Sequence, residues 1–292
     1  MLDSNLAIFG TTVLSAAVWL WLVLRYDKYE REPLRTVLRV GLIGGFLSGL
    51  CASVLNKVYI LQANLDLHRY SLPAGDAAMF SLFVGLNEEF FKFLLTLKLI
   101  KRLKEFNEPI DAVIYGTAVA LGFAFFENLD YAFEYGFLNV VVRSFTAVPL
   151  HLGLAAFWGV GIAKAHFIQG DKYFATSFPY LFTAAMLHAG YDFLCFTMDG
   201  GVLSSLAVSL LFAAGLFLYM RNRLRWLQQQ SPLLGGVLCE RCHAPQPSNA
   251  RFCFQCGAPI EQEFYIVCPN CGYRSFRRDN FCARCGARYQ DA

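Results

Sequence analysis

Seven windows of about twenty apolar residues constrain this chain more than any other feature. They lie near residues 5–24, 38–61, 77–98, 110–132, 140–163, 177–197 and 202–220. With 56% hydrophobic and 16% charged residues, the chain is too apolar for an ordinary soluble domain. We therefore expect an all-α polytopic membrane protein with about seven transmembrane helices, followed by a small polar tail.

Basic residues are distributed unevenly between the loops. Lys and Arg gather after the first, third, fifth and seventh windows, whereas the opposite loops hold only Arg69 and Arg143. By the positive-inside rule, this asymmetry predicts a multi-pass plasma-membrane protein with its N-terminus outside and its C-terminus in the cytoplasm.

Charged residues stand in the middle of the third window, at Glu88, Glu89 and Lys92. A charge at bilayer depth costs roughly 2.5–3.5 kcal/mol on insertion scales, and such residues are rarely kept for packing alone. Lys92 follows the glutamates by four and three residues, so an ion pair on one helix face accounts for one of them. Because neighbouring residues sit about 100° apart around a helix, the other glutamate can face a different wall of the bundle.

Polar side chains in three further windows lie at a similar depth. They are Glu127 and Asn128 at the end of the fourth window, His151 in the fifth, and His188 and Asp192 in the sixth. Pro149 precedes His151 by two residues and is expected to kink its helix toward a cavity. Counting about 1.5 Å per residue from the outer ends places Glu88 and His151 roughly 15 Å deep. A lone histidine in a membrane helix often does no more than bond a neighbouring carbonyl. The prediction of a polar cluster, open to the extracytoplasmic side, therefore rests on the similar depth of all these residues.

Such a cluster of carboxylates and imidazoles can activate water in two ways. A buried glutamate can act as general base while a histidine donates to the developing oxyanion. Alternatively, His and carboxylate ligands can hold a Zn²⁺-like ion that acidifies the water. Both routes lead to hydrolysis of a peptide bond, and the residues alone leave both open.

Two other classes of protein also stay open. A transporter or channel would use the same groups as a proton or cation path, and inverted repeats or broken helices would then be expected. A membrane scaffold that only presents the tail would not need these polar groups at matching depth.

Four motifs on successive windows carry a resemblance to a known family. In order they are Glu88-Glu89-x-x-Lys92, Phe123-x-x-x-Glu127-Asn128, His151, and His188-x-x-x-Asp192. This set, within residues 1–225, resembles the PrsW family of intramembrane proteases and, more distantly, the CAAX prenyl endopeptidase and Abi superfamily. Glu127 stands where the CAAX-type pattern has histidine, and Lys92 stands one residue before that pattern's arginine. Both departures favour PrsW.

The resemblance implies roles for the polar residues. Glu88 is implied as the water-activating base, Glu89 as its partner, and His188 as an oxyanion or metal-ligand group. The implied site is completed by Glu127, His151 and Asp192, with Lys92 and Asn128 in support. The implied activity is site-1 cleavage of membrane-anchored anti-sigma factors on the extracytoplasmic side. Because the family is described both as glutamic protease and as metalloprotease, a catalytic Zn²⁺ or other divalent ion stays open, and no organic cofactor is expected.

The tail carries eight cysteines in a repeated pattern. They are Cys239, Cys242, Cys253, Cys256, Cys268, Cys271, Cys282 and Cys285, and the second four repeat the spacing of the first. Two Cys-x2-Cys turns complete a closed tetrahedral Cys₄ site, which is typical of structural zinc. We expect a double zinc ribbon with two structural Zn²⁺ ions, whose folding depends on the metal.

These features divide the chain into a transmembrane protease domain (1–225), a linker (226–237) and a double zinc ribbon (238–290). The ribbons carry Arg274, Arg277, Arg278, Arg284 and Arg288, which could form a nucleic-acid patch. We instead expect the ribbons to dock a cytoplasmic protein or to regulate the enzyme.

Overall fold

The computed structural model describes residues 2–28, 30–66, 72–167, 172–197, 202–231, 237–239, 241–242, 245–246, 251–253, 256–260, 265–268, 270, 274–276, 281 and 286–288. The chain forms two compact units. One comprises Met1–Asp27 with Glu32–Leu227, and the other comprises Lys28–Arg31 with Gln228–Ala292.

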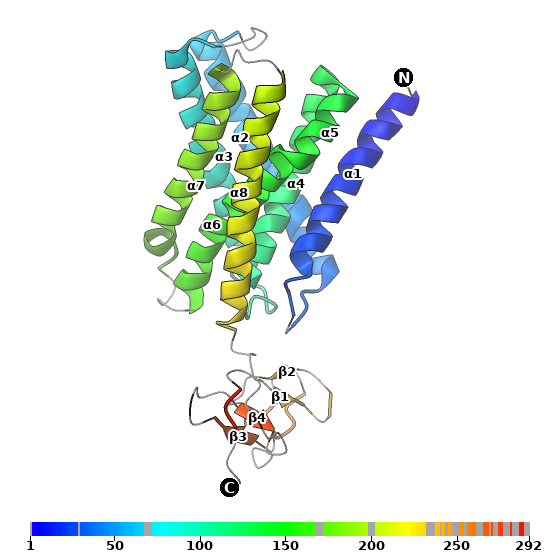
Figure 1. The fold of residues 1–292 in the computed structure, drawn as a ribbon, viewed down its shortest axis with the longest axis vertical. Helices are drawn as coiled ribbons and strands as arrows, with labels where there is room; N and C mark the ends of the chain where they lie inside the picture. Colours follow the sequence, from blue (N-terminus) through cyan, green and yellow to red (C-terminus); the bar gives the residue numbers. More distant parts are fainter. Residues whose placement is uncertain are drawn as a thin grey trace. The chain divides into compact units, whose positions relative to one another are not determined.

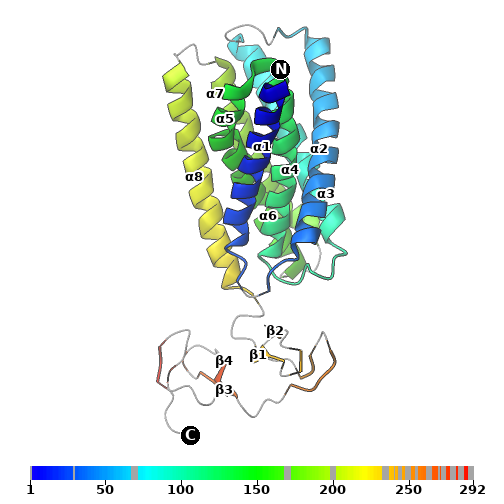
Figure 2. The ribbon, with the colours of Figure 1, turned by 90° about the vertical axis from the view of Figure 1, so that its right-hand side faces the viewer.

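The first unit is a bundle of α-helices, eight of which lie in the described residues (Figure 1). They are α1 (Leu2–Leu24), α2 (Leu34–Ala63), α3 (Ala74–Ile100), α4 (Asp111–Tyr135), α5 (Phe137–Phe145), α6 (Ala147–Phe167), α7 (Tyr173–Thr197) and α8 (Val202–Gln228). The long helices run side by side in both views, and α1 lies at the front of Figure 2. The prediction of an all-α membrane unit is confirmed.

Four stretches of the described residues are long and apolar enough to cross a membrane. They are Asn5–Leu24, Leu34–Ala63, Asp111–Tyr135 and Phe137–Phe167. α3 is also long enough, with 27 residues, but it carries Glu88, Glu89 and Lys92 in its middle. The predicted number of about seven spans is therefore supported only in part.

The predicted fifth window, 140–163, contains a helix break. α5 ends at Phe145 and α6 begins at Ala147, with Thr146 between them at φ −115° and ψ −72°. Pro149 lies in the first turn of α6, where a missing N–H costs no helical hydrogen bond. The helix break within this window therefore lies at Thr146, three residues before the proline.

α2 and α4 pack closely through small residues. Both helices contribute side chains to the polar cluster described below. A Cβ on Gly45 would lie 2.3 Å from the backbone carbon of Gly122, and a Cβ on Gly122 would lie 2.1 Å from the oxygen of Gly41. Only glycine permits such an approach of two backbones.

α6 lies in the core of the unit. Its Leu152, Leu154 and Trp158 side chains are fully buried, whereas α1 exposes Leu6 and Phe9. An exposed apolar face on a long helix is what a lipid-facing surface presents. The polar residues of the bundle are thus directed inward from helices whose outer faces are apolar.

The second unit contains two short antiparallel hairpins among its described residues. β1 (Val237–Leu238) pairs with β2 (Pro245–Gln246), and β3 (Tyr265–Val267) pairs with β4 (Arg274–Phe276). The repeat seen in the sequence recurs in the backbone, since the bridges Phe252–Pro259 and Phe281–Arg288 correspond. Gly257 and Gly286 both adopt φ of 70°, a left-handed conformation that favours glycine.

Candidate active site

The polar side chains of four predicted windows meet inside the bundle, on α3, α4, α6 and α7. Glu88, Glu89, Lys92, His151 and His188 are all buried, each at most 5% exposed. Buried charges require close partners, because an uncompensated charge is expensive outside water. The partners of each group therefore indicate what it does.

Lys92 is the central cation of the cluster. Its Nζ lies 2.7 Å from Oε1 of Glu89, 3.5 Å from Oε2 of Glu88 and 3.0 Å from Nδ1 of His151. The ammonium also lies 4.1 Å from the ring centre of Phe123. Because an ammonium can only donate, Nδ1 of His151 accepts here and the ring proton is on Nε2.

Nε2 of His151 contacts the carboxylate of Glu127 on α4. It lies 3.0 Å from Oε2 of Glu127, to which it donates a hydrogen bond. The same oxygen lies 2.6 Å from an Nη atom of Arg143. Glu127 therefore fixes the orientation of His151 from α4 and is itself paired with a cation on α5.

Glu89 is held by three donors and is completely buried. Nζ of Lys92 and Nδ1 of His188, at 3.0 Å, share Oε1, while Nε1 of Trp158 donates to Oε2 at 3.0 Å. This contact orients His188 so that its Nε2 lies 3.9 Å from Oε2 of Glu88 and 3.7 Å from Oδ2 of Asp192. The arrangement makes Glu89 an anchor rather than a group with a free oxygen.

Glu88 differs from its neighbour in having one carboxylate oxygen without a hydrogen bond. Oε1 accepts from Asn56 at 3.3 Å, whereas Oε2 is buried and has no hydrogen-bond partner. Glu88 lines a cavity of about 430 Å³. Four further predicted residues line the same cavity: Glu127, His151, His188 and Asp192. Its volume is within the usual range for a small-ligand site.

Three of these residues also fit a metal ion by their chemistry. Glu88, His151 and His188 each offer one ligand atom, and these atoms lie within 4.8 Å of one another. Two imidazoles and a carboxylate are a known zinc donor set. To ligate, His151 would exchange one of its contacts, because its ring nitrogens contact Lys92 and Glu127.

Two sequence families match the two parts of the chain. The family described as PrsW family intramembrane metalloprotease matches residues 32–220, more than half of the chain. The chain belongs to the PrsW family. The resemblance carried by the intramembrane motifs is thus confirmed. A second family, described as double zinc ribbon, matches residues 239–286.

Relatives from several bacteria support the same assignment. Protease PrsW of Geobacillus kaustophilus is 32% identical over 170 residues, which cover 58% of this chain and 70% of the relative. Protease PrsW of Clostridioides difficile is 32% identical over 200 residues, covering 65% and 79%. Protease PrsW of Bacillus subtilis is 27% identical over 168 residues, covering 58% and 73%. No solved structure shows significant similarity to the chain.

Arg143 is a residue of this PrsW-family site that the sequence analysis placed wrongly. It was assigned to an extracytoplasmic loop, but it lies in α5 and lines the cavity. Besides its ion pair with Glu127, its Nε donates to Oδ1 of Asn128 at 2.7 Å, and its guanidinium lies 3.9 Å from the ring centre of Tyr131. Asn128 thus supports the site through Arg143, and the positive charge belongs to the site rather than to a loop.

Asn56 and Trp158 also contribute contacts that the sequence analysis did not identify. The sequence contains a feature that could have indicated each of them. Asn56 is an amide within an apolar helix, and Trp158 follows His151 by seven residues, which places both on one face of α6. The periodicity indicates the face but not the carboxylate that each side chain reaches.

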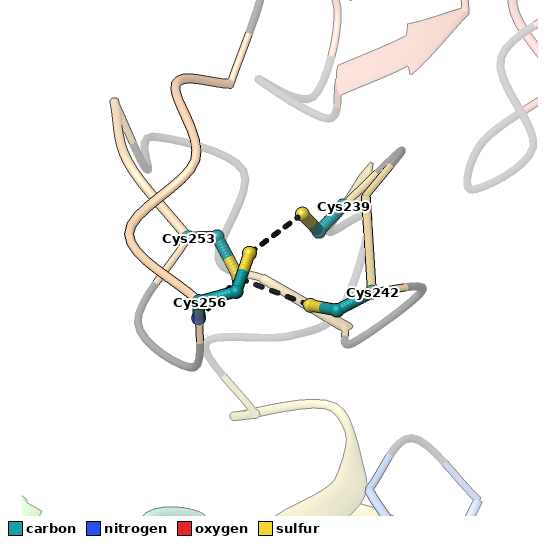
Figure 3. Close-up of side chains that lie close together, drawn as sticks. All are labelled: Cys239, Cys242, Cys253 and Cys256. Atoms are coloured by element: carbon teal, nitrogen blue, oxygen red, sulfur yellow. Dashed lines mark hydrogen bonds between the residues drawn. The ribbon is translucent and has the colours of Figure 1, made fainter.

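All four cysteines of the first predicted zinc site are among the described residues and lie close together (Figure 3). Sγ of Cys239 lies 3.6 Å from Sγ of Cys256, and Sγ of Cys242 lies 3.5 Å from Sγ of Cys253. All four cysteines can offer one ion a sulfur ligand, as a closed Cys₄ zinc site requires. In the second repeat only Cys268 is among the described residues, since Cys271, Cys282 and Cys285 lie outside them.

Proposed function

We propose that the chain is an intramembrane peptidase in which Glu88 activates the water that attacks the peptide bond. One observation carries this proposal: Oε2 of Glu88 is buried, has no hydrogen-bond partner and belongs to a residue that lines the cavity. The proposal also agrees with membership of the PrsW family.

The contacts suggest how the protons move. Glu88 takes a proton from water, and the resulting hydroxide adds to the carbonyl carbon of the scissile bond. The tetrahedral intermediate then breaks its C–N bond, and Nε2 of His188, which lies 3.9 Å from Oε2 of Glu88, is placed to carry that proton to the leaving amine. Oδ2 of Asp192 lies 3.7 Å from the same Nε2 and favours the protonated imidazole. Glu89, Glu127 and Lys92 keep the imidazoles in place.

A metal ion is the second candidate for water activation. Zn²⁺ or another divalent ion would be held by Glu88, His151 and His188, where it would acidify a bound water and polarise the scissile carbonyl. Glu88 would then be a ligand. The metal content of the purified full-length chain separates the two mechanisms, because His151→Ala and His188→Ala would each lose one metal ion per chain only if the ion is bound there.

We further propose that the substrate is a membrane-anchored protein, of the anti-sigma-factor type, cut on the extracytoplasmic side. This proposal needs the predicted topology of seven spans, with the N-terminus outside and the C-terminus in the cytoplasm. The distribution of Lys and Arg between the loops supports it, and the inward position of Arg143 strengthens the asymmetry by removing one cation from the outer loops.

For the tail we propose two structural Zn²⁺ ions and a cytoplasmic protein partner. The close cysteines of the first repeat and the match to a double zinc ribbon support the metal. We retain the division into a protease domain (1–225), a linker (226–237) and a ribbon domain (238–290) as part of this proposal.

The test compares membrane proteins from cells that produce either the wild-type chain or Glu88→Gln. Labelling of new N-termini is expected to find a cleaved membrane-anchored protein only with the wild-type chain. Equal cleavage by Glu88→Gln at equal protein levels would contradict the assigned role of Glu88. A Glu88-dependent proton or cation flux without any cleavage would instead support a transporter.

A further inference from the structure

An amide pair between α2 and α3, formed by Asn56 and Asn87, contacts the proposed base through Asn56. Nδ2 of Asn56 donates to Oε1 of Glu88 at 3.3 Å. Nδ2 of Asn87 donates both to Oδ1 of Asn56, at 2.9 Å, and to the backbone oxygen of Ala52, at 3.1 Å. The mechanism proposed above uses neither asparagine.

The orientation of both amides is determined by their partners. The oxygen of Ala52 can only accept, so the NH₂ group of Asn87 faces α2. Asn56 must therefore present its oxygen to Asn87, which leaves its NH₂ group for the carboxylate of Glu88. The backbone oxygen of Ala52 and the carboxylate of Glu88 can only accept, and together they fix the direction of each hydrogen bond in the pair.

Only one oxygen of Glu88 accepts a hydrogen bond from this pair. Asn56 holds Oε1, while Oε2 keeps no hydrogen bond. Oε2 also lies 3.5 Å from Nζ of Lys92 and 3.9 Å from Nε2 of His188. A carboxylate without a donor at Oε1 could rotate and exchange its two oxygens.

We propose that Asn56 is a positioning residue, which holds Oε1 of Glu88 so that Oε2 is directed to the water and the scissile bond. The inference rests on the proposed function of Glu88. It differs from a purely structural role, in which Asn56 would only join α2 to α3. That connection does not need Asn56, because Asn87 also bonds the backbone of Ala52 directly.

Two substitutions separate these roles. Asn56→Asp keeps the shape of the side chain and the acceptor for Asn87 but removes the donor to Glu88, whereas Asn56→Leu removes both. Gln62→Leu is the matched control, because it also replaces an amide on α2, at an exposed position that is not part of the cavity lining.

The assay uses the full-length chain in liposomes. The reporter is a single-span anti-sigma factor with a fluorophore on each side of its membrane helix. Both Asn56 variants are expected to lower kcat by about 10- to 100-fold, the factor for losing one hydrogen bond to a charged group. KM of both Asn56 variants stays close to that of the wild type, and Gln62→Leu behaves as wild type.

The outcomes distinguish this inference from the function on which it rests. If Glu88→Gln is inactive while both Asn56 variants retain the wild-type kcat per folded molecule, the role of Asn56 is wrong and that of Glu88 stands. A lower unfolding temperature with unchanged kcat would likewise assign Asn56 to structure alone. If the wild-type chain does not cut the reporter, or Glu88→Gln cuts it equally well, the proposed function itself fails.

Discussion

Nδ1 of His188 lies 3.0 Å from Oε1 of Glu89, although 99 residues separate them in the chain. The contact joins α7 to α3 inside the bundle. It assigns different parts to two adjacent glutamates, because Glu89 has both oxygens engaged while Glu88 keeps one without a hydrogen bond.

The first prediction concerns this difference. Glu89→Gln removes the closest counter-charge of the buried Lys92 and should destabilise the folded chain by about 3–5 kcal/mol, as expected for a broken buried ion pair. Glu88→Gln should abolish cleavage with little change in stability, because Lys92 keeps Glu89. Thermal unfolding of the purified chains in detergent measures both. Equal losses of stability would contradict the assignment of Glu89 as the anchor.

The second prediction concerns the cation on α5. Arg143→Gln leaves Glu127 without its cation and should lower kcat/KM by about 10- to 100-fold, since His151 loses a fixed partner. Arg143→Lys keeps the charge but not the planar fork that reaches both Glu127 and Asn128, so it should restore only part of the activity. Arg39→Gln, at an exposed position of α2, serves as the control. Full activity of Arg143→Gln would show that Glu127 needs no cation.

The third prediction concerns the close packing of α2 on α4. Gly45→Ala places a Cβ 2.3 Å from the backbone of Gly122, so the helices must separate and the yield of folded protein should fall. Gly49→Ala, one turn later on the same helix, meets its nearest atom at 3.8 Å and should fold normally. Size-exclusion profiles and unfolding temperatures compare the two. Similar behaviour of the two variants would mean that the helices pack less tightly than described.

The fourth prediction concerns the tail. Cys239→Ser should remove one zinc ion per chain and make the tail sensitive to protease, because a Cys₄ site that loses a thiolate binds zinc weakly. The membrane unit should keep its unfolding temperature. Cys51→Ser, on α2, is expected to retain all the zinc. Unchanged zinc content in Cys239→Ser, measured by elemental mass spectrometry, would contradict the Cys₄ site.

The sequence predicted the convergence of the polar residues better than their contacts. A similar depth for Glu88, His151 and His188 could be expected because helix rise is constant, so positions can be counted from the end of each apolar window. The identity of the partner on a neighbouring helix depends on tertiary packing. For that reason the bonds from Trp158 to Glu89 and from Asn56 to Glu88 could not be predicted.

Two parts of the fold also escaped prediction for physical reasons. The break at Thr146 lies within a window whose mean hydropathy is that of a single span, so hydropathy gives no sign of it. Arg143 stands near the start of the same window and resembles a loop residue, yet its partners Glu127, Asn128 and Tyr131 place it inside the bundle. A charge near the end of an apolar window is ambiguous until its partner is known.

The most direct test of the account is the cleavage rate of the single-span reporter by purified full-length chain in liposomes, measured for the wild type and for Glu88→Gln at equal folded concentration. We expect cleavage by the wild type and none by Glu88→Gln, with closely similar unfolding temperatures. Cleavage by Glu88→Gln at the wild-type rate would contradict the claim that Glu88 activates the water.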